Sequence, residues 1–330
     1  MKSAALAVFC LGLSVGVRAE EIRTPDRAPA GGDIVKGRGI RLFKKEKRVE
    51  LDTVIGVRRG FIEYLVCQKG MGKDHESVFY CEAKPRDIQF ALLMLGLKQG
   101  LPGTGPKAQG DPTPPTGDPV EIIVRWTEVE AVSTRDGKET RAPVYPAVAE
   151  ALGKEAADRG FTILVQKEGK EIDLFAAVDA KAELPLAGPA SPIVRWTRGD
   201  KPASEPLEKV LGAAAGAKVV GTARETHAEE FLMRAKTGET LPGFHWIFSG
   251  SRFERDPRTE RETFLAEVDG QIVGTCHDPA SIIDVSLSEK GLSHEEIRAN
   301  EKRIPVEGTP AILEIRPAPK AAPPPPAKEK

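Results

Sequence analysis

Five residues of this 330-residue chain have side chains and spacing that could support chemistry: Cys67, His75, Cys81, Cys276 and His277. His75 lies in a polar segment between Cys67 and Cys81, and Cys276 directly precedes His277. Thiolate and imidazole ligands suit zinc or copper, and three or four of them would bind one ion if the two segments meet in space. One interpretation of this set is therefore a zinc or copper site.

The same residues also fit two structural interpretations. A disulfide between Cys67 and Cys81 would close a loop of about 15 residues and contribute about 3 kcal/mol, with His75 and Glu76 holding the loop by hydrogen bonds. In the second, the cysteines are free thiols that pack in the core as small hydrophobic side chains. Because the spacing matches no short metal motif, we favour the disulfide or core packing over the metal site.

Other patterns give no support for catalysis. Ser249-Gly250-Ser251 lacks the G-x-S-x-G nucleophile elbow, and His227 with its neighbouring carboxylates does not form H-E-x-x-H. The chain also contains no phosphate-binding G-x-x-x-x-G-K-[ST] motif. We therefore favour a protein that is not an enzyme and has no cofactor; zinc or copper is the alternative.

The amino terminus has the pattern of a secretory signal. Lys2 precedes an uncharged, largely apolar stretch at residues 4–17 that is too short to anchor the chain in a membrane. Small residues at Val17 and Ala19 then occupy the positions that a signal peptidase reads. Cleavage after Ala19 predicts a periplasmic or extracellular protein. Cys10 lies too early in the stretch to be the lipidated residue of a lipoprotein signal. Cleavage of the signal removes Cys10 and leaves Cys67, Cys81 and Cys276 in an oxidising compartment.

Composition limits the partners that we expect. Forty-eight basic and forty-nine acidic residues give a formal charge of −1, and the two signs are interspersed. A nucleic-acid-binding surface is therefore not expected. No stretch after the signal approaches the roughly 20 apolar residues of a membrane helix, so we expect no transmembrane segment in the mature chain. The sequence identifies no partner, and a protein of the cell envelope is one candidate.

The hydrophobic pattern predicts an α+β fold that is mostly β, with antiparallel sheets around one buried core helix. Strand patterns occur at residues 48–52 and 61–67, which we expect to be neighbours, and at 120–126, 245–253 and 311–315. Residues 263–268 and 271–276 flank Asp269-Gly270, the pair that best fits a type I′ hairpin turn. This hairpin would present Cys276 and His277 at its end.

The core helix is expected at about residues 86–98. Ile88, Ala91 and Leu92 share one face, and Phe90 and Leu93 add a second apolar stripe. A helix that is apolar nearly all round must be covered on most sides, so we expect it at the centre of the core.

Several segments together resemble the YdjY-type domain family. Those of its first half are GFIEYLVC (60–67), KDHESVF (73–79), KP (84–85) and QFALLMLG (89–96); those of its second half are WIFSGSRF (246–253), GQIV (270–273) and DPASIID (278–284). The resemblance implies an exported domain without an assigned biochemical role.

The residue pattern and the resemblance together suggest a division of the chain. A signal peptide (1–19) and a flexible leader (20–33) precede the first half of a YdjY-like domain (34–126); an insertion or second subdomain (127–243) separates it from the second half (244–316), and a disordered Pro-rich tail (317–330) follows. We expect a non-enzymatic binding or structural module of the envelope. The alternative is a metal-binding or redox protein that uses the Cys/His group.

Overall fold

The computed structural model describes residues 34–104, 113–135, 137–154, 156, 161–167, 169–178, 183–188, 191–199, 201–213, 216–241, 245–255, 260, 262–286 and 296–319. The predicted signal peptide and leader lie outside these residues, as does the predicted tail from Lys320 onward. In these ranges no helix has both the length and the apolar character that crossing a membrane requires.

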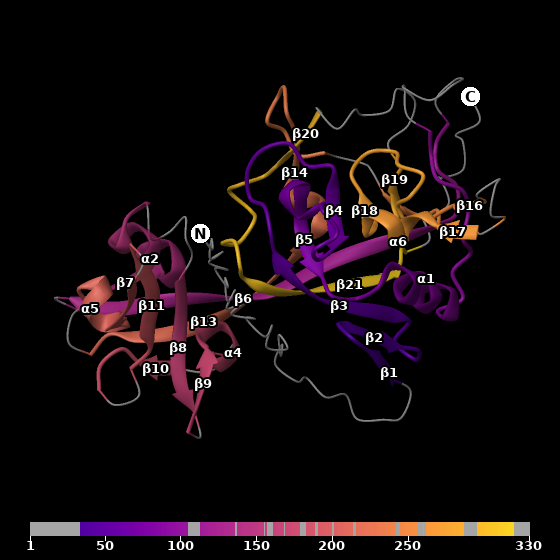
Figure 1. The fold of residues 1–330 in the computed structure, drawn as a ribbon. Helices are drawn as coiled ribbons and strands as arrows, with labels where there is room; N and C mark the ends of the chain where they lie inside the picture. The colour runs from indigo at the N-terminus through magenta and orange to yellow at the C-terminus, as the bar shows by residue number, and fades with distance from the viewer. Residues whose placement is uncertain are drawn as a thin grey trace, which may run out of the picture.

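A large sheet organises the described part of the chain (Figure 1). Its strands are β1 (Ile34–Gly37), β2 (Ile40–Phe43), β3 (Arg48–Ile55), β4 (Tyr64–Gln68), β5 (Ser77–Cys81), β6 (Asp118–Arg135), β7 (Lys138–Pro143), β10 (Glu183–Pro185), β13 (Lys218–His227), β15 (Trp246–Phe248), β18 (Gln271–Gly274), β19 (Asp284–Val285) and β21 (Pro310–Pro317). The central order is β10-β13-β6-β21-β3-β5-β4-β18. Its pairings are antiparallel except for β4 with β5, so the predicted antiparallel, mostly β fold is confirmed.

Three smaller sheets and a few short helices complete the described fold. The sheets contain β12 (Lys201–Pro206), β11 (Ile193–Arg198), β8 (Phe161–Lys167) and β9 (Lys170–Asp173); β14 (Leu232–Arg234) and β20 (Ile297–Ala299); and β16 (Phe253–Arg255) and β17 (Glu262–Phe264). The α-helices are α1 (Pro85–Met94), α2 (Val144–Leu152), α4 (Leu174–Ala177), α5 (Leu207–Leu211) and α6 (Leu265–Asp269). Short 3-10 turns occur at η1 (Asp74–Glu76) and η2 (Ala228–Phe231).

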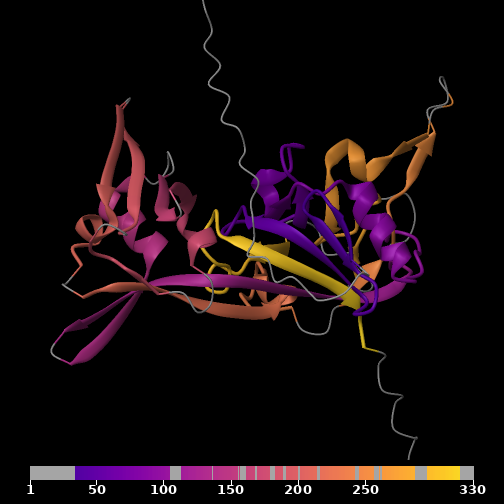
Figure 2. The same ribbon diagram turned by 90° about the horizontal axis from the view of Figure 1, so that it is seen from below.

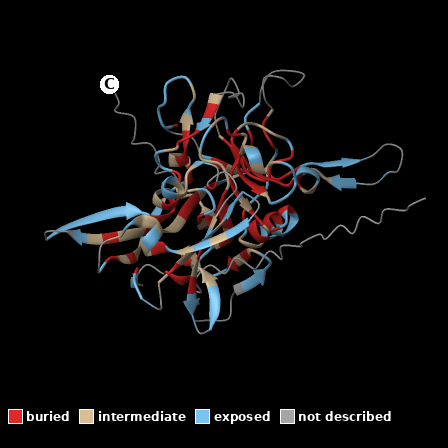
Figure 3. Ribbon diagram, turned by 60° about the vertical axis from the view of Figure 1, so that its left-hand side comes forward, coloured by how far each residue is buried: buried red, intermediate tan, exposed pale blue. Residues whose placement is uncertain are grey.

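Buried apolar side chains form two clusters. One lies around β3, β4, β5, α1 and β21, and the other around α2, α5 and the β8–β11 strands. The eighteen-residue strand β6 runs through both regions, as Figure 2 shows. Figure 3 shows buried residues in the interior of the fold and exposed residues on the outlying strands. The expected boundary between residues 126 and 127 falls inside β6. The insertion at 127–243 stays a prediction, and it shares this strand with the first-half segment that precedes it.

Helix α1 confirms a buried helix but is shorter and less covered than the sequence suggests. It ends at Met94 because Gly96 adopts φ +84° and the amides of Gly96 and Leu97 bond to the carbonyls of Leu93 and Leu92, a Schellman stop. Ile88 and Leu92 are fully buried. Phe90 is 63% exposed and Leu93 42% exposed, so the expectation of cover on most sides is wrong.

Two predicted strand arrangements are also wrong. Strands β3 and β4 are not neighbours, because β5 lies between them and pairs with both. Residues 265–269 form α6 instead of a hairpin strand, and β18 pairs with β4. Leu, Ala and Glu favour a helix in that segment, and Gly270 at φ +70° ends it as a helix cap.

An ion-pair ladder crosses one side of the large sheet. Glu50 of β3 lies directly opposite Glu314 of β21, and both carboxylates are nearly buried. Arg125 of β6 contacts them at 2.6 and 2.9 Å, and Arg48 also contacts both. Opposed like charges would separate the strands, so the two arginines hold this register.

We predict that Arg125→Met lowers the free energy of unfolding by about 2 kcal/mol, because it removes one of the two cations that bridge the nearly buried carboxylates, although Arg41 still contacts Glu50 and Arg316 still contacts Glu314. Arg224→Met is the matched control, since the Arg224–Glu128 pair is exposed and should contribute less than about 0.5 kcal/mol. Urea denaturation of both variants gives the comparison. Equal effects of the two substitutions would contradict the structural importance of the ladder.

Candidate functional site

The two cysteines expected to form a disulfide lie on neighbouring strands as free thiols. Cys67 of β4 pairs with Tyr80, whereas Cys81 of β5 pairs with Gln68. Because consecutive side chains in a strand point to opposite faces, this register directs the two sulfur atoms apart. The favoured Cys67–Cys81 disulfide is therefore absent from the structure, and the core-packing interpretation fits better.

Burial makes all three described cysteines weak nucleophiles. Loss of hydration raises the pKa of the Cys67 and Cys81 thiols to about 12. Burial, followed by the Asp278 carboxylate, raises the pKa of Cys276 to about 12 as well. A thiol that stays protonated at neutral pH neither attacks a substrate nor binds a metal readily, so this environment disfavours redox chemistry.

The two candidate histidines have different surroundings. His75 lies in η1 with its side chain 77% exposed and its Nε2 3.9 Å from Glu76. His277 is buried, and its Nδ1 lies 3.0 Å from Asp284 Oδ1. In the ranges that the structure describes, no three His, Cys, Asp or Glu side chains gather closely enough to hold an ion. The five predicted residues therefore do not assemble into one site.

The buried Asp284 instead joins two segments of chain. It accepts hydrogen bonds from the amides of Gly103 at 3.0 Å and Val285 at 2.7 Å, besides its contact with His277. Burial raises the pKa of its carboxyl. Gly103 lies so close to the His277 ring that a Cβ there would come within 2.7 Å of it. This cluster fixes the 101–104 segment to the sheet and explains His277 as a structural residue.

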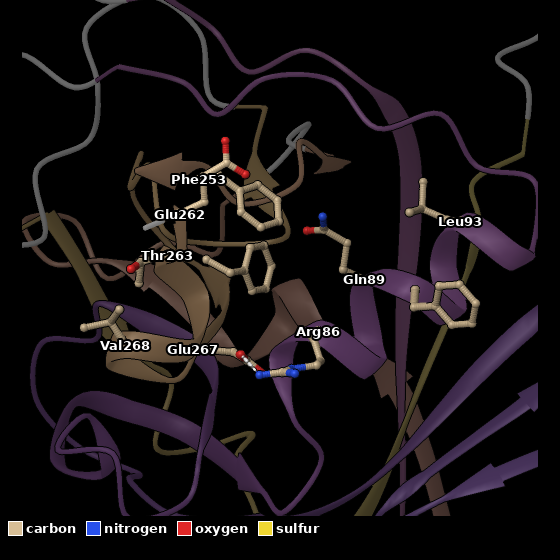
Figure 4. A pocket seen from close by; sticks show the side chains of 10 residues that line it. Arg86, Gln89, Leu93, Phe253, Glu262, Thr263, Glu267 and Val268 are labelled. Carbon is tan, nitrogen blue, oxygen red and sulfur yellow. Dashed lines mark hydrogen bonds and ion pairs between the residues drawn. The ribbon is translucent and has the colours of Figure 1, made fainter. Parts of the chain in front are cut away.

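The structure shows a groove that sequence reasoning missed. One wall is α1, with Arg86, Gln89, Phe90 and Leu93; the other is the β16–β17 hairpin and α6, with Phe253, Glu262, Thr263, Phe264, Glu267 and Val268 (Figure 4). We call this the α1–hairpin groove; its volume is about 560 Å³. That volume lies within the range of protein ligand sites.

Exposed apolar side chains concentrate at this groove. Eight large apolar side chains are exposed in the described part of the chain. Four of these eight line the groove: Phe90, Leu93, Phe253 and Val268. Phe253 is 62% exposed although it pairs with Phe264, with 5.0 Å between the ring centres. A gathering of this kind is typical of interaction sites, whereas isolated exposed apolar residues are ordinary.

Polar contacts fix the two walls relative to each other. The Gln89 side-chain oxygen accepts a hydrogen bond from the Ser251 amide at 3.1 Å, and the Ser251 hydroxyl accepts one from the Ala266 amide at 3.0 Å. Arg86 forms a two-pronged ion pair with Glu267, drawn as a dashed contact in Figure 4. The groove is therefore built before any ligand arrives.

The signal for this site lay in the helix pattern. Phe90 and Leu93 are three residues apart, on a stripe separate from that of Ile88 and Leu92. The pattern showed that two stripes exist. It could not show that the second stripe lines a groove, because the other wall of the groove lies more than 150 positions later in the chain.

Comparison with known proteins bears on α1 directly. Residues 40–142 match the model of the YdjY domain. The resemblance predicted from the motifs is thereby confirmed over this part of the chain, and the YdjY domain match includes all of α1. The resemblance of residues 246–284 to the second half of the domain lies outside the match and stays a prediction. No curated protein and no solved structure matches the chain.

We predict that the chain beginning at Glu20, purified without reductant and then denatured, contains three free thiols by Ellman titration. The register of β4 and β5 directs Cys67 and Cys81 apart, so neither should be oxidised with the other. In the native state these two thiols should react only at the rate of unfolding, since they are buried and protonated. A count of one that rises to three on reduction would establish the disulfide and contradict this account.

Proposed function

We propose that this chain is an exported, non-enzymatic binding protein of the cell envelope, and that its binding site is the α1–hairpin groove. The gathering of four exposed apolar side chains in one preformed groove carries the proposal. The amino-terminal signal pattern with cleavage after Ala19 supports export. The YdjY domain match over residues 40–142 agrees with this proposal without adding a reaction.

The lining suggests an extended peptide as the ligand. The groove lies between a helix and a two-stranded hairpin, and the phenylalanines at positions 90, 253 and 264 provide flat apolar surfaces. Aromatic grooves of this kind suit extended proline-containing segments, which lose little conformational entropy on binding. The lining has one basic and two acidic side chains, and Arg86 is paired with Glu267. A basic residue in the ligand would balance the remaining acidic charge.

The neutral fluorescent dye Nile red tests whether the groove accepts apolar ligands. We predict saturable binding to the full chain that weakens at least tenfold in Phe253→Ser and in Val268→Ser, because each substitution removes an apolar contact. Phe61→Ser is the matched control, since Phe61 is 54% exposed and lies outside the groove. Thermal unfolding should show that all three variants fold.

Two outcomes of the dye experiment would contradict the proposed binding site. Binding that is not saturable, or that falls equally in the Phe61→Ser and Phe253→Ser proteins, would show that the groove is no preferred site. The two groove substitutions lie on different elements, the hairpin and α6. Damage to the hairpin alone therefore cannot imitate the expected pattern.

A further inference from the structure

The segment after Pro319 has the chemistry of a groove ligand. Residues 320–330 have the sequence KAAPPPPAKEK, with four consecutive prolines at 323–326. Such a run favours the extended polyproline II conformation. Domains that recognise this conformation seat proline rings against aromatic side chains. The phenylalanines of the α1–hairpin groove offer such surfaces.

The described chain ends beside the helix that forms one wall of the groove. Strand β21 ends at Pro317, and the amide of Ala318 donates a hydrogen bond to the carbonyl of Pro119 at 3.0 Å. The preceding residue, Asp118, accepts a hydrogen bond from the amide of Lys98 at 2.8 Å. Lys98 lies four residues after the end of α1. The segment therefore leaves the sheet close to the end of this helix.

The same connection leads into the groove. Gln99 follows Lys98, and its side-chain oxygen accepts a hydrogen bond from Gln89, which lines the groove, at 3.1 Å. The last proline, Pro326, is seven residues beyond Pro319 and lies up to about 22 Å from it at the polyproline II rise of about 3.1 Å per residue. The ten-residue helix α1 is only about 15 Å long. The prolines can therefore reach the groove without any rearrangement of the sheet.

The charges of the two partners are complementary. The segment carries Lys320, Lys328 and Lys330 against Glu329, a net charge of +2. The groove carries Arg86 against Glu262 and Glu267, a net charge of −1. Charges within about 10 Å attract measurably at ordinary salt. The attraction favours docking of the segment over an uncharged competitor.

We infer that residues 320–330 dock in the α1–hairpin groove of their own chain and compete with outside ligands. This inference rests on the proposed function, because it needs the groove to be a binding site. A tethered segment has an effective concentration of about 1 mM. If its intrinsic dissociation constant is about 0.2 mM, it lowers the apparent affinity of a competing ligand about sixfold.

The test compares Nile red binding to full chains that differ only in the segment. One carries P323S, P324S, P325S and P326S, which remove the preformed conformation and the proline rings but keep the length and charge. The control carries A321S and A322S, which keep the proline run. We expect the four-serine chain to bind the dye about sixfold more tightly than the natural chain, and the control to bind like the natural chain.

Three results would overturn the inference. Equal dye affinity in the natural and four-serine chains would show that the groove binds ligands but the segment does not dock there, so the proposed function would stand alone. A difference that grows with protein concentration would mean that the segment docks in a second copy. Absence of saturable dye binding in all chains would reject the proposed function itself.

Discussion

The buried amide of Gln89 is the contact on which the groove depends. It joins α1, which rests on the large sheet, to Ser251, and Ser251 in turn holds the first turn of α6. A polar side chain on the inner face of a helix is costly unless its hydrogen bonds are made, and Gln89 makes them with Ser251 and Gln99. This pairing fixes the spacing of the two walls, and the ion pair of Arg86 with Glu267 fixes the outer edge.

The second apolar stripe of α1 stays exposed because the core covers only the first stripe. Ile88 and Leu92 pack in the core, while Phe90 and Leu93 line the groove. Phe253 and Val268 complete the opposite side without closing over them. A fold selected only for stability would leave fewer such side chains in water, so the arrangement favours an interaction at this place. The cysteines and His277, in contrast, are explained by packing and by hydrogen bonds.

Local patterns in the sequence were sufficient for part of this structure. Alternating and branched residues located β3, β6 and β21, and the apolar spacing located the buried face of α1, because these depend on neighbours in the chain. The parallel pairing of β4 with β5 places the Cys67 and Cys81 side chains on opposite faces of the sheet. That pairing depends on contacts between separate segments, which a local sequence pattern does not contain. Asp269-Gly270 misled for a related reason, since Gly270 at positive φ can end a helix as well as turn a hairpin. The groove was missed because its two walls come from segments more than 150 positions apart in the chain.

We propose that the outer stripe of α1 serves binding and not folding, and two adjacent leucines distinguish these roles. Leu92 is fully buried and Leu93 is 42% exposed, so the same substitution probes each stripe in turn. Measured by urea denaturation, Leu92→Ala should lower the free energy of unfolding by about 2–5 kcal/mol and Leu93→Ala by less than about 1 kcal/mol. A loss of similar size at both positions would mean that the core covers the outer stripe, and the groove would not exist as described.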